Sequence, residues 1–465
     1  MSSRRAVRIA SVASGLACAL AAPVVARASG FAAAEFGGEH GNVVTTNPTA
    51  LYFNPAGIAL GEGTRLYVSG VLAYRRGSWL HTQAASEMPD PPGAEGADTG
   101  QARFSTLFGA PALAATTWIR RVAVGGAFYV PFGGRVHWDQ NPRFANDPKF
   151  PLAADGVQRW HLIEGSVSSL YFTVGAALRL GPDALGVTGN VVRSSVHSRQ
   201  AKSFNPQEVV DPLNEGRIGI DVAGTHASFG VGAMVEAIRE RLWFGASYQA
   251  PPGFGPIHLD GTLSTSLGAD VAPPRPITYT YALPDIVRAG LRVRPPIAAP
   301  RALELRLYAD LTRWSRMQAQ CVSIQGEPCA VFTDGTDATP GATTIQNIRR
   351  RWNDTYGANL GASVWPSSAV EVFAGAGFAT AATPDATLDP MMADANNFRF
   401  AIGGRFAVPS GFHVTAGLTS VQYSSRDNTG RSTLTDAQLP TRRPDGGGKY
   451  ELWLGLFQVS LEKEL

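Results

Sequence analysis

Residue types that often perform catalysis are present in this chain, but their spacing matches no recognisable catalytic motif. The eight histidines are scattered, and none has a carboxylate and a serine at a motif spacing. The sequence has no glycine-rich phosphate loop and no helical histidine motif for a metal. We therefore expect no enzyme, no cofactor and no metal site. A hydrolase whose residues meet only in the fold stays open as an alternative.

Two of the three cysteines suggest a disulfide. Cys321 and Cys329 lie eight positions apart in a polar segment that contains Gly and Pro. A metal site would need further ligands nearby, and this segment has none. Two cysteines at this spacing fit a small closed loop in an oxidising compartment. We expect Cys321 and Cys329 to be bridged.

The N-terminal residues predict export. Three arginines precede an apolar run over residues 9–25, and the small-x-small pattern Ala26-Arg27-Ala28 follows. We interpret residues 1–28 as a signal peptide. An uncleaved anchor helix is the alternative, but the run is short and rich in Ala, Ser and Gly.

The composition gives no reason to expect nucleic acid as a partner. Charged residues make up 17% of the chain, and the formal net charge is +3. No block of Lys and Arg interleaves with aromatic residues. The 51 glycines occur beside Val, Phe, Tyr and Leu, which favours strands with small residues where backbones approach closely.

Residues 302–312 alternate between an apolar and a polar face, which is the pattern of a strand. The same alternation occurs in residues 287–294, 398–408 and 412–419. One face of 302–312 carries Leu303, Leu305, Leu307, Ala309 and Leu311, and the other carries Glu304, Arg306, Tyr308, Asp310 and Thr312. These strands are longer than the usual five or six residues, and about 9 to 11 residues cross a bilayer.

Short turns alternate with long polar loops, which indicates an all-β, fourteen-stranded antiparallel transmembrane β-barrel. Two of the expected long loops are residues 251–275 and 321–348. The apolar faces should meet lipid and the polar faces the lumen. The predicted strands begin near Thr64, Phe104, Val122, Ser166, Ala184, Arg217, Arg241, Ile277, Ala302, Arg350, Ala369, Asn396, Gly411 and Lys449.

Residues 29–63 precede the first predicted strand and are too long for a simple tail. They contain two Asn-Pro pairs, which punctuate the backbone and predict a compact, irregular segment. A fourteen-stranded barrel leaves a lumen that such a segment could fill. We expect residues 29–63 to form a plug and residues 64–465 the barrel. The best marker of the plug is Asn54-Pro55-Ala56-Gly57. The alternative is that these residues form only a turn before the first strand.

Several side chains are candidates for contact with a ligand. Phe31 and Phe36 would either touch an apolar ligand or pack the plug. Inward arginines would either bind a carboxylate or pair with acids across the lumen; these are Arg288, Arg292, Arg306, Arg399 and Arg405, with Glu304, Asp310 and Asp221 expected on the same inner face. Trp314, Trp352, Tyr248 and Tyr356 lie near predicted strand ends, and we interpret them as aromatic girdles.

Six segments, in order, resemble the FadL family of outer-membrane long-chain fatty acid transporters, which includes aromatic-hydrocarbon transporters. They are SGF (29–31), NPTALYFNPAGIA (47–59), VAVGGAFYVPFGG (122–134), YALPDIVRAGLRVRPP (281–296), YADLTRWSRM (308–317) and RRWNDTYGANLGASVWP (350–366). The resemblance implies an N-terminal hatch in the lumen and a gap in the wall beside a kinked third strand. Gly133, Gly134 and Gly175 are candidates for that irregularity.

The expected function is therefore passive, hatch-gated transport across a bacterial outer membrane. The resemblance implies long-chain fatty acids as ligands, with aromatic hydrocarbons as the close alternative. Expected partners are this hydrophobic ligand and outer-membrane lipid, around a monomer. A general porin or a surface adhesin is the rival reading.

Overall fold

The computed structural model describes residues 36–82, 90–205, 207–267, 270–297, 302–332, 336, 338, 343–409 and 411–465. The predicted signal peptide and Phe31 lie outside the described residues. Among the described residues, every helix is short, and none has the length and hydropathy that a membrane-spanning helix needs.

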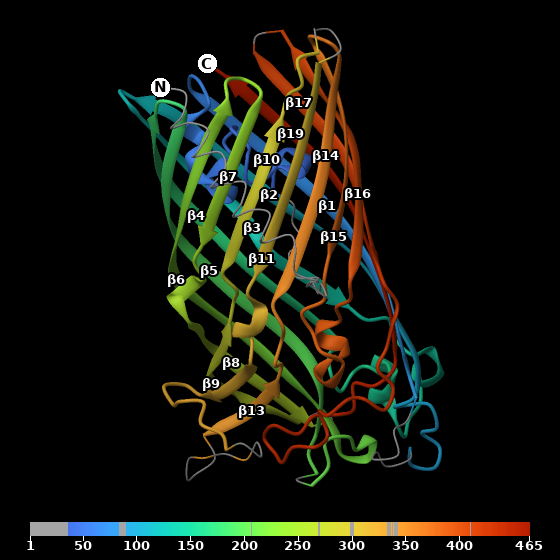
Figure 1. The fold of residues 1–465 in the computed structure, drawn as a ribbon. Helices are drawn as coiled ribbons and strands as arrows, with labels where there is room; N and C mark the ends of the chain where they lie inside the picture. Colours follow the sequence, from blue (N-terminus) through green and yellow to red (C-terminus); the bar gives the residue numbers. More distant parts are fainter. Residues whose placement is uncertain are drawn as a thin grey trace.

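The molecule is one closed antiparallel β-barrel (Figure 1). Closure occurs where β1 pairs with β19, with Arg65 opposite Glu464 at one rim. The strands are β1 Arg65–His81, β2 Gly100–Ile119, β3 Val122–His137, β4 Glu164–Leu180, β5 Asp183–Ser203, β6 Glu215–Ile238, β7 Leu242–Gln249, β8 Pro256–Leu267, β9 Asp270–Ala282, β10 Ile286–Val293, β11 Ala302–Thr312, β12 Ala319–Ile324, β13 Thr344–Arg349, β14 Thr355–Ser367, β15 Val370–Ala379, β16 Asn397–Val408, β17 Phe412–Tyr423, β18 Arg426–Asp427 and β19 Lys449–Glu464.

The predicted count of fourteen wall strands is confirmed. Eight of the nineteen strands join end to end as four interrupted wall strands, namely β7 with β8, β9 with β10, β11 with β12 and β13 with β14. The two-residue β18 is too short to cross the wall. Tight turns such as 120–121 and 181–182 lie on one rim, here called the short-turn rim, and the opposite end is the long-loop rim.

Two predicted loops are wrong in part, because residues 251–275 contain β8 and the start of β9, and residues 321–348 contain β12 and β13. These strands extend the wall toward the long-loop rim. In β8, Ile257 and Leu259 are buried while His258 and Asp260 face outward. Because the outer face of β8 is polar, this strand lacks the apolar alternation of a membrane span, and its sequence predicts a loop. In β12 four consecutive residues are buried, so it shows no exposed apolar face either.

The predicted inner and outer faces are confirmed along β11. Leu307 is 47% exposed on the outside, whereas Glu304 and Arg306 are buried inside at 5% and 2%. Arg288 and Arg292 of β10 are also buried on the inner face. The prediction for Asp221 is wrong: it is exposed on the outer face of β6, beside the buried Val222.

The girdle prediction is wrong for Trp314 and Trp352. Each is only 2% exposed, and their rings pack edge to face with centroids 5.1 Å apart. Trp314 also contacts Phe132 of β3. Both tryptophans lie where wall strands are interrupted, and there the two-residue alternation no longer fixes which way a side chain points. Tyr356, inside β14, is 41% exposed on the outer face.

Residues 36–63, here called the lumen segment, pack against the inner side of the wall. They comprise a 3-10 turn at Gly38–His40, the one-turn helix α2 Ala50–Phe53 and a 3-10 turn at Pro55–Ala59. Val43, Val44, Leu51 and Ile58 form a buried cluster with wall residues such as Met234. The short 3-10 turns Pro142–Phe144, Pro151–Asp155, Pro212–Asn214, Pro252–Phe254, Trp314–Arg316, Asp385–Thr387 and Pro390–Met392 lie between strands.

The structure contains a disulfide between Cys321 of β12 and Cys329, whose Cα atoms lie 6.2 Å apart. We predict that neither cysteine of the purified protein reacts with iodoacetamide before reduction, and that both react afterwards. Peptide mass mapping with and without reductant measures this. Alkylation of both residues in the unreduced protein would contradict the bridge.

Candidate functional site

The lumen segment is fixed to the wall through Asn54. The side-chain Nδ2 of Asn54 donates to the carbonyl of Val43, at 2.8 Å, and to that of Ala233 in β6, at 3.0 Å. Its Oδ1 accepts from the backbone N–H of Ala56. Asn54 is fully buried. One side chain therefore caps the following 3-10 turn and joins two parts of the lumen segment to a wall strand.

Glycines in the wall leave the space that this motif occupies. A Cβ at Gly232 of β6 would overlap the Asn54 side chain, and a Cβ at Gly186 of β5 would overlap the backbone of Pro55. Gly175 of β4 similarly faces the side chain of Leu51. The wall and the Asn-Pro-Ala-Gly motif are therefore complementary in shape.

The other end of the lumen segment contacts the opposite side of the barrel. His40 Nε2 lies 2.8 Å from Glu371 Oε1 of β15. The Glu39 carboxylate lies over Gly361 and Gly375, which are paired across β14 and β15, and it is 4.0 Å from Arg306 Nη2. The lumen segment thus crosses the barrel from β5 and β6 to β14 and β15.

Phe36 lies at the centre of an aromatic cluster. Its ring stacks on Tyr129 of β3 with centroids 5.0 Å apart, and it also contacts Tyr52, Phe53 and Tyr67. Phe36 is 4% exposed. Of the two readings from the sequence, this geometry matches packing of the segment, and whether Phe36 also contacts a ligand stays a prediction.

The backbone ladder is interrupted between β2 and β3. These strands pair over residues 113–119 and 122–128, and beyond that only an isolated bridge joins Phe104 to Trp138. Along the stretch between these pairings, which is fully described, β2 and β3 have no ladder contact. We call this stretch the wall gap.

Prolines and an inserted residue account for the wall gap. Pro131 of β3 and Pro111 of β2 lack the N–H that a ladder uses. The pairing of β3 with β4 shifts between Tyr129 and Phe132, which places one extra residue in β3. Such a bulge bends its strand and interrupts pairing.

Of the three glycines that were candidates for the kink in the third strand, two lie beside the irregularity and one does not. Gly133 and Gly134 directly follow the bulge and line a pocket beside the wall gap. Gly175 lies in the regular β3–β4 ladder opposite Gly125, so it is not the irregularity. Its role is to make room for Leu51.

A largely apolar pocket extends from the wall gap into the lumen. It has about 830 Å³ of unfilled space, part of it open to solvent. Pockets that bind small hydrophobic ligands are mostly apolar. Its apolar lining consists of Phe108, Val136, Leu162, Val167, Val196, Ile220, Ile348, Met391 and Met392.

Arg75, on the inner face of β1, is the one residue of this lining with a permanent charge. Among the described residues no carboxylate lies within 4.0 Å of its guanidinium, and the Asp394 carboxylate attracts it from farther away. Nη2 makes one long hydrogen bond, 3.4 Å, to the carbonyl of Ala393, and Cζ lies 5.5 Å from the Phe104 ring centre. Most of its donors are therefore available to an anionic group in the pocket.

The arginines proposed from the sequence lie elsewhere. Arg288 packs over the Tyr52 ring, with Cζ 4.5 Å from the ring centre. Arg306 Nη1 is 2.8 Å from Glu304 Oε1. Arg399 lies half-buried in β16 beside Gly377. None of the three lines the pocket.

A signal for Arg75 was present in the sequence. Leu72 and Tyr74 face outward in β1, so alternation turns Arg75 inward and Arg76 outward. The pattern of residues 75–78 does not by itself show which of the two adjacent arginines points inward, because all four residues are polar or Gly and the apolar face ends before them.

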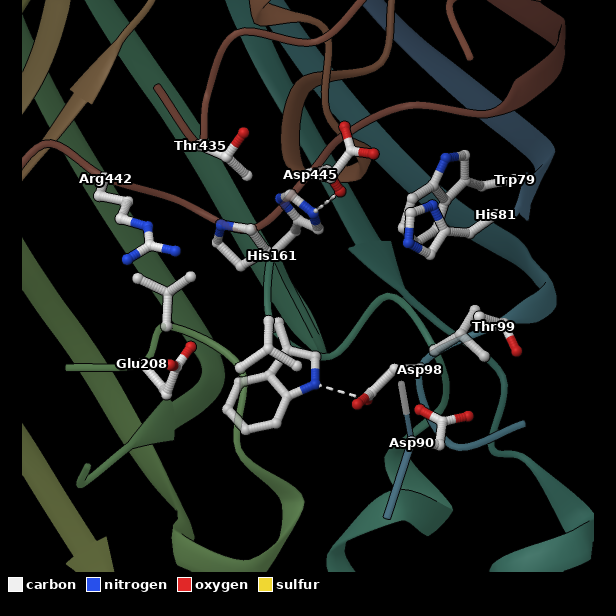
Figure 2. A pocket seen from close by; sticks show the side chains of 15 residues that line it. Trp79, His81, Asp90, Asp98, Thr99, His161, Glu208, Thr435, Arg442 and Asp445 are labelled. Carbon is white, nitrogen blue, oxygen red and sulfur yellow. Dashed lines mark hydrogen bonds between the residues drawn. The ribbon is translucent and has the colours of Figure 1, made fainter. Parts of the chain in front are cut away.

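Loops at the long-loop rim enclose a second, polar pocket (Figure 2). The indole N–H of Trp160 donates to Asp98 Oδ1 at 2.7 Å, and His161 Nε2 lies 3.1 Å from the Asp445 carbonyl oxygen. Asp98 is also paired with Arg159 at 2.8 Å. Because its polar groups largely bind one another, this pocket differs from the apolar one at the wall gap.

A buried ion pair stabilises the loops around that rim. Asp389 Oδ2 and Arg350 Nη1 are 3.0 Å apart and fully buried, and His161 Nδ1 is 3.8 Å from the same oxygen. Burial raises the pKa of Asp389, but Arg350 and His161 outweigh this and hold the pKa well below its usual range. Burial lowers the pKa of nearby Arg443 to about 10.

Solved structures with the same architecture exist at low sequence identity. A FadL homologue from Pseudomonas aeruginosa aligns with a TM-score of 0.72 and 16% identity, covering 94% of this chain and 98% of that one. The chain has the FadL fold. The toluene transporter TbuX of Ralstonia pickettii (TM-score 0.62, 12% identity, 94% and 96% covered) and the toluene transporter TodX of P. putida (0.61, 12%, 90% and 94%) share this fold.

The structural alignment covers 94% of the chain, whereas the sequence resemblance is confined to six short segments. No family model matches the sequence, and no curated protein matches it either. At 12–16% identity the solved structures show the shared fold and leave the ligand of this chain open.

We predict that Asn54→Ala loosens the lumen segment without unfolding the barrel. The change removes hydrogen bonds to buried groups, which costs about 1–3 kcal/mol. Hydrogen–deuterium exchange in detergent should therefore rise over residues 43–58 and stay unchanged in β14–β17. Equal exchange over residues 43–58 in both proteins would contradict the role of Asn54.

We predict that Asp389→Asn destabilises the long-loop rim locally by about 3–5 kcal/mol, because it leaves Arg350 buried without its partner. Hydrogen exchange over residues 380–396 measures this, with exposed Asp427→Asn as the control.

The folded pKa of Asp389 lies below the unfolded value of about 3.9. The ion pair of Asp389 therefore contributes to the stability of the long-loop rim above about pH 4, and this contribution is lost as pH falls through the folded pKa. Protection that declines between pH 8 and pH 5 would contradict this assignment.

Proposed function

We propose that this protein carries hydrophobic small molecules bearing a carboxylate, such as long-chain fatty acids, passively across the outer membrane of a bacterium. The observation that carries this proposal is Arg75, whose guanidinium lines a largely apolar pocket and has no carboxylate within 4.0 Å in the described part of the chain. A guanidinium binds a carboxylate through two parallel hydrogen bonds. The apolar lining suits the hydrocarbon part of the ligand.

The proposed route runs through the wall gap. A ligand would enter between the loops of the long-loop rim, bind in the pocket, and leave sideways where β2 and β3 lack ladder contact. The toluene transporters of the same fold bear on the rival ligand class, aromatic hydrocarbons. An aromatic hydrocarbon can gain only a cation–π contact from Arg75, whereas a carboxylate gains two charge-assisted hydrogen bonds, and this favours the carboxylate.

The lumen segment is proposed as the hatch that gates this route. It contacts both sides of the barrel, through Asn54 on β6 and through His40 on β15. Tyr129 of β3 stacks on Phe36 immediately before the bulge that follows it in β3. Movement of Phe36 would therefore displace Tyr129 at the edge of the wall gap.

Uptake of a labelled long-chain fatty acid tests the function. The host is a bacterium that lacks its own outer-membrane fatty acid transporter and carries this chain or the chain without residues 29–46. We expect the intact chain to restore uptake and the shortened chain to alter it. A correctly inserted, heat-modifiable barrel without uptake would remove fatty acids as ligands.

Two other measurements test the rival functions. Free ion conduction in planar bilayers would favour the general porin. Surface binding that depends on the loops and tolerates loss of the hatch would favour the adhesin.

We predict that Arg75→Gln weakens fatty acid binding roughly 10- to 100-fold, because a charge-assisted hydrogen bond contributes about 1.5–3 kcal/mol. Arg193→Gln, at an exposed position of β5 outside the pocket lining, is the matched control. Binding of a neutral aromatic hydrocarbon, which can make only a cation–π contact with Arg75, should change less than fatty acid binding. Equal fatty acid affinity of the Arg75 variant and the parent would contradict the proposed carboxylate contact.

A further inference from the structure

Two adjoining hollows lie on the outer surface of the wall, across β1, β2, β16, β17 and β19. The lower hollow is apolar and has about 970 Å³ of unfilled space, open to the outside. The upper hollow, toward the long-loop rim, is more polar. Tyr74 and Trp453 line both of them, so the hollows form one continuous groove.

Strand register explains the apolar part. Tyr74 of β1, Gly455 of β19 and Ser420 of β17 lie side by side in adjacent strands. Gly455 has no side chain, so a depression remains between its neighbours. The next outward layer toward the short-turn rim contains Leu72, Phe457, Leu418 and Ile402. The depression therefore continues as an apolar channel of the kind that an acyl chain could fill.

Trp453 forms the boundary between the two hollows. Its indole Nε1 donates to Ser420 Oγ at 3.1 Å, and the Tyr74 ring packs edge to face against it at 6.0 Å. Gly455 lies under the indole, where a Cβ would be 2.6 Å from the ring. The indole is thus held against the wall.

Two arginines line the upper hollow. Arg76 Cζ lies 5.1 Å from the centre of the Trp453 ring, and Arg103 donates to Gln101 at 2.8 Å. Ser78 of β1 is paired with Arg103 of β2, two residues beyond Arg76. Among the described residues, neither arginine has a carboxylate within 4.0 Å.

Two carboxylates also line the upper hollow. Glu451 is paired with Lys449 at 3.0 Å, so its charge is balanced by a neighbour. Asp139 is exposed, and its backbone N–H donates to the carbonyl of Arg103. The two arginines and two carboxylates that line the hollow have a formal charge of zero in sum, and Lys449 neutralises Glu451 from outside the lining.

The arginines lie at the height expected for lipid headgroups. On the outer face of β1, Leu66, Val68, Leu72 and Tyr74 are 42–49% exposed, and Arg76 comes next. About 9 to 11 residues of a tilted strand cross the apolar part of a bilayer. The span from Leu66 to Arg76 matches that length.

We propose that this outer groove binds a membrane lipid with a phosphate-bearing headgroup. The phosphate would contact Arg76 and Arg103, which can donate several charge-assisted hydrogen bonds. An acyl chain would lie along Gly455 between Tyr74 and Ser420. This inference rests on the outer-membrane location in the proposed function, and it concerns a surface that the transported ligand does not use.

An ordinary aromatic girdle accounts for Tyr74 and Trp453 alone. It does not account for two arginines next to an apolar groove that have no carboxylate within 4.0 Å in the described part of the chain. A girdle also binds lipids without regard to headgroup charge, so headgroup selectivity separates the two readings.

Native mass spectrometry of the detergent-purified full chain tests the proposal. The probes are phosphatidic acid, diacylglycerol as the neutral lipid with the same chains, and inorganic phosphate. The variant is Arg76→Gln with Arg103→Gln. The control is Arg135→Gln with Arg193→Gln, which removes the same charge from exposed positions on β3 and β5.

We expect phosphatidic acid to bind the parent and the control at least tenfold more tightly than the Arg76/Arg103 variant, and diacylglycerol to bind all three equally. Three results would overturn the proposal: an equal loss in the control, unchanged binding in the variant, or inorganic phosphate that binds as tightly as the lipid. Retention of lipid in detergent is independent of uptake, so failure of this site and failure of fatty acid transport are scored separately.

Discussion

The structure depends on a backbone ladder that closes on itself. β1 pairs with β19 along nearly its whole length, so the wall has no free edge. In an apolar medium each unpaired backbone N–H or C=O costs several kcal/mol. Interruptions of the wall must therefore be local. At the wall gap, Pro111 and Pro131 have no N–H to lose, which lowers the cost of leaving β2 and β3 unpaired.

Small residues in the wall couple it to the segment inside. Gly232 and Gly186 accommodate Asn54 and Pro55, and Gly361 with Gly375 accommodates Glu39. A barrel with larger inward residues at these four positions would repel the lumen segment. The same close contacts place Phe36 against Tyr129, one residue before the bulge in β3. The position of the lumen segment and the shape of the wall gap are therefore linked through the contact between Phe36 and Tyr129.

Charge pairing separates structural arginines from available ones. Arg306, Arg350 and Arg159 lie within 4.0 Å of carboxylates and are almost fully buried. Arg75 faces the apolar pocket and Arg76 the outer groove, and both have few protein partners among the described residues. Two adjacent residues of one strand thus present guanidinium groups to the two sides of the wall.

The sequence alone determined the barrel, because two-residue alternation and turn spacing are local properties. It identified fourteen strands, the inner position of Arg288 and Arg306, and the unusual Asn-Pro-Ala-Gly segment. Only the tertiary structure decided where Trp314 and Trp352 point, since interrupted strands lose their alternation. It also decided which arginine lines the pocket, because pairing with distant acids depends on strand neighbours that the sequence order does not reveal.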